Sequence, residues 1–139
     1  MQIARVHLKS AARSWLLLAA LFLLSFCPAT AHATPKIVTD ADKGGTVHIK
    51  LGDALEVRLG SNPATGNRWY MHKQSTPLLK LRGISQTKLT QPGVERPFVQ
   101  IFEFEPMAKG TGVLLLHYAR SWDKSDPDEE QFSLHVTIE

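Results

Sequence analysis

Cysteine is nearly absent from this sequence. The 139 residues contain one cysteine, Cys27, which lies in the first quarter of the chain. A single cysteine cannot close a disulfide within the chain, although disulfides are the usual support of small exported domains. We therefore expect a fold that has no disulfide and is held together by its apolar core.

Motifs for catalysis and nucleotide binding are also missing. The chain has no G-x-S-x-G elbow, no P-loop and no dinucleotide fingerprint. The acidic stretch 123–130, DKSDPDEE, lacks the glycine and the ligand order of a calcium loop. Four histidines outside the N-terminal segment lack the spacings common in metal sites; they are His48, His72, His117 and His135. We expect no enzymatic activity, no metal and no cofactor.

The N-terminal 33 residues have the three-part pattern of a secretory signal peptide. A start with three basic residues precedes the apolar run WLLLAALFLLSF (15–26), and AHA (31–33) fits a small-x-small cleavage site. This apolar run is shorter than a membrane-spanning helix, which needs about 20 residues. We expect cleavage after Ala33 and a secreted or periplasmic product that is free of the membrane. A retained anchor is the alternative, and a lipoprotein is a weaker one because bulky Phe26 precedes Cys27.

The positive charge of the chain belongs partly to this N-terminal segment. The whole chain has 16 basic and 13 acidic residues and a pI of about 9.2. Residues 1–33 hold three of the basic residues and no acidic ones, which leaves 13 of each sign in residues 34–139. A balanced domain gives no electrostatic reason to bind nucleic acid or a membrane surface.

Alternation of apolar and polar residues with a period of two dominates residues 46–139. Inward-facing apolar residues are expected at Val47 and Ile49, at Leu55, Val57 and Leu59, at Trp69 and Met71, and at Phe132, Leu134, Val136 and Ile138. Further strands are expected at 37–38, 77–86, 97–105 and 112–120, the last being apolar on both faces and therefore central. The run 97–105 changes phase near Ile101 and Phe102, which predicts a bulge or two covered faces.

About seven to eight short strands without a helical period indicate an all-β fold. Residues 34–139 form one domain whose length suits an immunoglobulin-like β-sandwich of about 100 residues. The Cys–Trp–Cys arrangement of antibody domains is absent, so we expect Trp69 to be a core residue.

Two stretches stand out from this strand pattern. In SNPATGNRWY (61–70), Asn62 can bond its own backbone, Pro63 fixes φ and Gly66 permits a positive φ, so the loop is stiff and narrow. Its small uncharged tip can enter a cleft without desolvating a charge. In YARSWD (118–123), Arg120 and Trp122 are residue types favoured at interfaces. The alternatives are an ordinary turn and a tryptophan that caps the end of the sandwich.

Together these stretches resemble the chagasin family of papain-type cysteine-protease inhibitors. Members carry an N-P-T-T-G loop followed shortly by Trp, and later a G-x-x-x-l-x-l-x-Y-x-R-P-W segment. Here the two read NPATGNRW and GTGVLLLHYARSW, and the preceding LGDALEVRL matches the usual G-d-x-h-x-h-x-L entry. Order and spacing agree from Val47 to Ile138.

The resemblance implies an immunoglobulin-like sandwich that presents three loops at one end to a papain-like cysteine protease. It places a first loop over the catalytic cysteine, a middle loop within Thr90–Pro97, and a third loop beside the active-site histidine. The residues it assigns to protease binding are Asn62, Pro63, Ala64, Thr65 and Gly66 in the first loop, Gly93, Val94, Glu95 and Arg96 in the middle loop, and Arg120, Ser121 and Trp122 in the third.

This chain departs from the family pattern in three places. Ala64 replaces a threonine, which is a mild change because the position stays small. Ser121 replaces a proline, which loosens the third loop. The middle loop is usually rich in glycine, whereas here it has only Gly93, with Glu95 and Arg96 added. This departure predicts a narrower range of bound proteases.

The expected function is reversible inhibition of papain-family proteases by a monomer, which requires Thr65 and Trp122 to lie at the same end of the molecule. One alternative is an exported immunoglobulin-like binding or structural module that uses the same loops for a non-protease envelope partner. The other is a small envelope enzyme or metal carrier.

Overall fold

The computed structural model describes residues 34–120, 122 and 130–139. The expected signal peptide, Ser121 and the acidic stretch 123–129 lie outside the described residues. No helix in the described part of the chain is long and apolar enough to cross a membrane.

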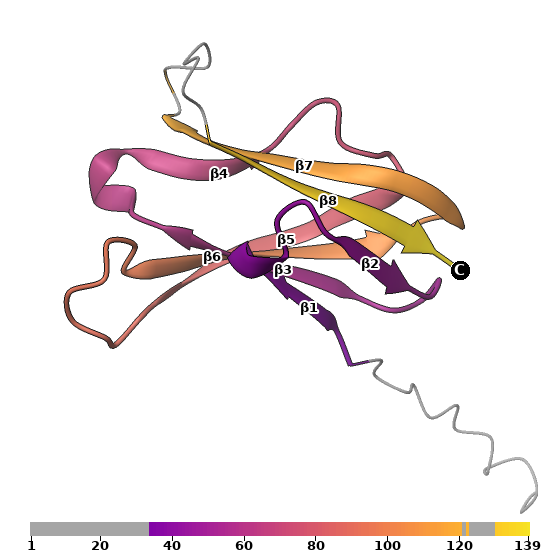
Figure 1. Cartoon of the computed structure of the whole chain (residues 1–139), viewed down its shortest axis with the longest axis horizontal. Helices are drawn as coiled ribbons and strands as arrows, with labels where there is room; N and C mark the ends of the chain where they lie inside the picture. Colours follow the sequence, from indigo (N-terminus) through magenta and orange to yellow (C-terminus); the bar gives the residue numbers. More distant parts are fainter. Residues whose placement is uncertain (1–33, 121, 123–129) are drawn as a thin grey trace, which may run out of the picture. The chain divides into compact units, whose positions relative to one another are not determined.

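Eight strands form two four-stranded sheets (Figure 1), so the prediction of an all-β sandwich with seven to eight strands is confirmed. The strands are β1 (Lys36–Thr39), β2 (Thr46–Ile49), β3 (Leu55–Ser61), β4 (Asn67–Met71), β5 (Leu79–Lys88), β6 (Phe98–Pro106), β7 (Gly110–Arg120) and β8 (Glu130–Ile138). Two short 3₁₀ turns, η1 (Asp40–Asp42) and η2 (Pro63–Thr65), join β1 to β2 and β3 to β4. The strand order is β1-β3-β6-β5 in one sheet and β2-β8-β7-β4 in the other.

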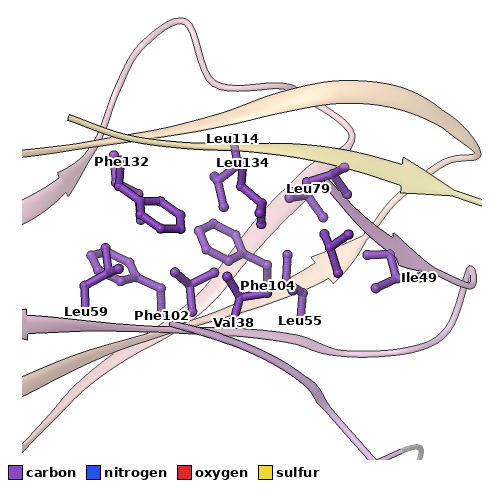
Figure 2. Close-up of a cluster of buried hydrophobic side chains, with 14 of the residues drawn as sticks. Val38, Ile49, Leu55, Leu59, Leu79, Phe102, Phe104, Leu114, Phe132 and Leu134 are labelled. Atoms are coloured by element: carbon purple, nitrogen blue, oxygen red, sulfur yellow. The ribbon is translucent and has the colours of Figure 1, made fainter. Parts of the chain in front are cut away.

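The apolar faces of the two sheets pack against each other and form the core (Figure 2). Every other residue of β3 and β8 points inward, as the alternation predicts, because successive side chains of a strand lie on opposite faces. Trp69 on β4 is 2% exposed and is therefore a core residue, as expected. β7 lies between β8 and β4, which confirms that it is a central strand.

The phase change expected near Ile101 and Phe102 is absent from the buried face of β6. Its buried positions alternate without interruption and include a polar residue, Gln100. The bulge is instead in the neighbouring strand β5, where the register shifts between Leu81 and Gly83. The apolar pattern changes in the sequence because glutamine occupies an inward position, whereas Ile101 on the other face is half-buried.

The start of β1 and the end of β8 lie at the same end of the sandwich. Lys36 at the start of β1 pairs with Leu55 at the start of β3, and Ile138 at the end of β8 pairs with Gly110 at the start of β7. β3 and β7 run from there toward the opposite end, where they lead into the first and third loops. Figure 1 shows the C-terminus on the far side of the sandwich from η2.

One buried hydroxyl provides a test of the packing beneath the first loop. Ser61, at the end of β3, is fully buried, and its Oγ has no hydrogen-bond partner within the described part of the chain. Because burying an unbonded hydroxyl is costly, Ser61→Ala is expected to raise the free energy of unfolding by about 1 kcal/mol in urea denaturation. Ser85→Ala, at an exposed position on β5, is the control and should change it by less than about 0.5 kcal/mol. A loss of stability on Ser61→Ala would contradict the description of the Ser61 hydroxyl as buried without a hydrogen-bond partner.

Candidate functional site

The first loop is held in shape by hydrogen bonds within its own residues. The Oδ1 atom of Asn62 accepts a bond from the backbone N–H of Ala64 (3.2 Å), and Pro63 opens the turn η2. The Thr65 hydroxyl donates to the Asn62 carbonyl (2.7 Å) and accepts from the Asn67 N–H (3.3 Å). Gly66 ends the turn with φ of 81°, a left-handed conformation that glycine adopts without strain. The exposed tip, Ala64 and Thr65, is therefore small, uncharged and rigid.

The first loop is also bonded to its two neighbours along the sandwich end. The backbone N–H of Asn62 donates to the Tyr118 hydroxyl on β7 (2.8 Å). Its side-chain Nδ2 donates to the Glu95 carbonyl in the middle loop (3.0 Å). Asn62 therefore fixes the first loop to the middle loop and to the strand that precedes the third.

Gly66 and Trp122 bring the first and third loops into contact. A Cβ atom built on Gly66 would lie 2.8 Å from Cη2 of Trp122, so the indole packs directly over the glycine. The Trp122 side chain is still 73% exposed, as the sequence predicts for a residue beyond the strand end. Thr65 and Trp122 thus lie at the same end of the molecule, which the inhibitor hypothesis requires.

The middle loop connects β5 to β6 and is closed at its base by a bond from the Leu89 N–H to the Pro97 carbonyl (2.7 Å). Gly93 has φ of 81°, and Val94 next to it is a half-exposed apolar side chain. Figure 1 shows this connection at the same end of the sandwich as η2, in agreement with the Asn62–Glu95 bond. Glu95 is thus placed beside the first loop.

Arg96 lies in the middle loop, as expected, and its side chain turns toward the sandwich and bonds residues of β3 and β8. Its guanidinium bonds both carboxylate oxygens of Glu130 and the Gly60 carbonyl (3.4 Å), and lies 4.8 Å from the centre of the Tyr118 ring. The hydrogen bond to Glu130 and the charge of that carboxylate raise the pKa of Arg96, against the opposing effect of its partial burial. Gly60 leaves room for this arrangement, since a Cβ atom there would lie 3.2 Å from Cδ of Arg96.

Trp69 and Gln100 support the site from inside the sandwich. Trp69 packs against Tyr118 with the ring centres 5.1 Å apart and the ring planes tilted by 40°, and its Nε1 donates to the Gly60 carbonyl (2.9 Å). The Gln100 side chain reaches across the sandwich, where it accepts from the Trp69 N–H (3.0 Å) and donates to the Trp69 carbonyl (2.9 Å). Because β4 is an edge strand, these bonds satisfy backbone groups that would otherwise be buried without partners.

Sequence reasoning missed Tyr118, Glu130, Gln100 and Gly60. Tyr118 could have been found from its place in the Y-x-R segment, whereas Glu130 gave no local signal. Arg120 is exposed at the end of β7 and pairs in register with Asn67 beside the first loop, where it is available to a partner.

The histidines form no metal site among the described residues. His48 and His135 are exposed on outward positions, as expected. His72 and His117 come within 5.4 Å of each other with their rings perpendicular. Within residues 34–120, 122 and 130–139, no three His, Cys, Asp or Glu side chains converge on a common point that could hold a metal ion.

Comparison with known proteins identifies the family. The model of the chagasin family peptidase inhibitors, I42, matches residues 48–136. The chain belongs to this family. The matched segment begins in β2 and ends in β8, so it contains all three loops of the site.

Two relatives of this chagasin-family chain cover most of its length. It is 26% identical over 119 residues to Amoebiasin-2 of Entamoeba histolytica, with 85% of this chain and 96% of the relative covered. It is 28% identical over 115 residues to Chagasin of Trypanosoma cruzi, with 71% and 94% covered. A crystal structure of a cysteine protease inhibitor from Entamoeba histolytica has the same fold, with a TM-score of 0.68 at 24% identity and 78% and 98% of the two chains covered.

Proposed function

We propose that this domain inhibits papain-like cysteine proteases by reversible occlusion of the active-site groove. The observation that carries the proposal is the junction of the three loops at one end of the sandwich, through the Gly66–Trp122 contact and the Asn62–Glu95 bond. The family is one of peptidase inhibitors, which does not favour the alternative of a binding module for a non-protease partner.

The shape of the first loop suits entry into a groove. The nucleophile of a papain-like enzyme is a cysteine thiolate, and a substrate is cleaved only when its carbonyl carbon lies within reach of this thiolate. The Ala64–Thr65 tip carries no charge and no long side chain, so little desolvation and little loss of side-chain entropy accompany its insertion. Its internal bonds fix the conformation before binding, which further lowers the ordering cost.

Trp122 and the middle loop would contact the rims of the groove on either side of the first loop. An exposed tryptophan beside an exposed arginine, Arg120, has the composition of an interface hot spot. Val94 offers a smaller apolar contact from the middle loop. The protease is thereby blocked with no bond made or broken, and the inhibitor leaves intact.

We further propose that the domain acts after export, with residues 1–33 removed. The pattern of basic start, apolar run and small-residue cleavage site supports this, and the secreted or periplasmic product would begin at Thr34. Amino-terminal sequencing of the protein recovered from the extracellular or periplasmic fraction tests it. A product that retains the leader would contradict it.

Titration of residues 34–139 against papain or a cathepsin-L-like protease tests the inhibitory function. We expect stoichiometric loss of hydrolysis of a fluorogenic peptide and recovery of the inhibitor at full mass after dissociation. Occlusion without chemistry also predicts that a protease with its catalytic cysteine replaced by alanine still binds in calorimetry. No inhibition of several such enzymes at micromolar protein would overturn the proposal, and cleavage of the first loop would overturn its mechanism.

A further inference from the structure

Three side chains from the bases of the loops meet at the end of the sandwich. We call Arg96, Tyr118 and Glu130 the loop anchor. Arg96 lies one residue before the end of the middle loop, Tyr118 lies on β7 two residues before Arg120, and Glu130 is the first residue of β8. Tyr118 and Glu130 are the last register partners of the β7–β8 ladder, so the Arg96 guanidinium lies against the end of this ladder that is nearer to the third loop.

The loop anchor also reaches the first loop. The Tyr118 hydroxyl accepts the Asn62 N–H at the start of the first loop (2.8 Å), and Arg96 donates to the Gly60 carbonyl near the end of β3 (3.4 Å). The Gly60 N–H is in turn bonded to Oδ2 of Asp40 in η1 (2.9 Å). The same cluster thus contacts the bases of all three loops.

The loop anchor differs from an ordinary surface ion pair. The Arg96 and Glu130 side chains are only 32% and 37% exposed, and the guanidinium uses its donors on two partners while its face covers an aromatic ring. A lysine cannot reproduce this, because an ammonium lacks the planar fork and the flat face. By contrast, the Arg82–Glu105 pair at the other end of β5 and β6 is about half exposed on both sides, and such pairs contribute little.

We infer that the loop anchor sets the positions of the three loops relative to one another and so controls inhibition without contacting the protease. The inference rests on the proposed function. Arg96, Tyr118 and Glu130 are positioning residues in this account, and Arg96 is reassigned from direct protease contact. When the anchor is lost, the loops occupy the binding-competent arrangement for a smaller fraction of the time.

The kinetics of inhibition distinguish positioning from direct contact. A smaller competent fraction weakens apparent affinity in proportion, and its effect falls on association. Loss of a direct contact raises the dissociation rate instead. For Arg96→Met we expect an association rate constant about tenfold lower with the dissociation rate constant unchanged, and for Arg96→Lys a partial loss of about threefold. The control is Arg82→Met, which removes an exposed arginine–glutamate pair away from the loops and should change neither constant.

A second measurement needs no protease. In the free domain, Tyr118→Phe removes the acceptor of the Asn62 N–H but keeps the ring, so amide exchange of Asn62 should become faster. Arg96→Met should shift the amide resonances of Asn62 and Glu95, and Arg82→Met should not. Unchanged exchange and unchanged resonances in the anchor variants would overturn the inference, as would a loss of inhibition carried by faster dissociation.

The two proposals fail separately. If the unaltered domain inhibits no papain-like protease, the proposed function fails, and the amide measurements still decide whether the anchor places the loops. The other outcome is that the unaltered domain inhibits the protease while the Arg96→Met and Glu130→Gln variants associate with the protease at the same rate as the unaltered domain. In that case the inference about the loop anchor fails and the inhibitory function stands.

Discussion

Replacing Thr65 with arginine is expected to raise the inhibition constant about a thousandfold, equivalent to ~4 kcal/mol of binding free energy. Thr65 is exposed at the tip of the first loop, the part proposed to enter the protease groove. An arginine there would bring a long charged side chain into a space that fits a small neutral one, and its charge would have to be desolvated. The substitution also removes the hydroxyl that bonds Asn62 and Asn67.

Two controls separate the effect of bulk and charge from other causes. Thr65→Ser keeps the hydroxyl and its two bonds, so inhibition should stay within about threefold, an energy difference below ~1 kcal/mol. Thr111→Arg places the same arginine at an exposed position near the start of β7, at the opposite end of the sandwich, and should leave inhibition unchanged. Inhibition by Thr65→Arg equal to that of the unaltered domain would remove the first loop from the mechanism.

Replacing Trp122 with alanine is expected to weaken inhibition about a hundredfold, since truncated tryptophans at interface hot spots cost about 2–4 kcal/mol. The side chain is 73% exposed in the free domain, so its loss should leave the melting temperature within the scatter of surface substitutions. Met107→Ala, at an apolar residue 52% exposed just after β6, is the matched control at the other end of the sandwich. Equal loss of inhibition in both variants would indicate a nonspecific effect.

A double-mutant cycle tests the contact between the indole and the first loop. Gly66→Ala forces a methyl group to 2.8 Å from the Trp122 ring and strains a residue with positive φ, so it should displace both loops. In a Trp122→Ala background the clash with the indole disappears, so Gly66→Ala should raise the inhibition constant by a smaller factor than it does when Trp122 is present. Gly52→Ala, at φ of 100° with no described atom within 4 Å of the added Cβ, shows the effect of the strain alone.

The strands and the first loop could be predicted because the signals for them are local. Alternation along β3 and β8 predicted their inward faces correctly, since a strand has a fixed period of two. The Asn-Pro and Gly signals of the first loop act within five residues of one another, and the structure shows the turn they indicate. These features depend on sequence neighbours rather than on the packing of the domain.

The supporting residues could not be predicted for the opposite reason. Arg96 meets Glu130 across 34 positions of sequence, and Gln100 meets Trp69 across 31. The phase change in the apolar run of β6 suggested a bulge or two covered faces. It arises because Gln100 points inward and bonds the backbone of Trp69 on the edge strand β4 of the other sheet. Only the packing of the two sheets shows that Arg96 contacts Gly60, Glu130 and Tyr118, on which we base the proposal that it positions the loops.

The placement of Lys36 and Glu139 has a practical consequence. Both chain ends of the domain emerge from the side that faces away from Asn62 and Trp122. A purification tag, a bead or a second module attached at either terminus would hold the domain with its recognition loops pointing outward. We therefore expect a domain immobilised through either end to keep its three loops accessible to a protein partner.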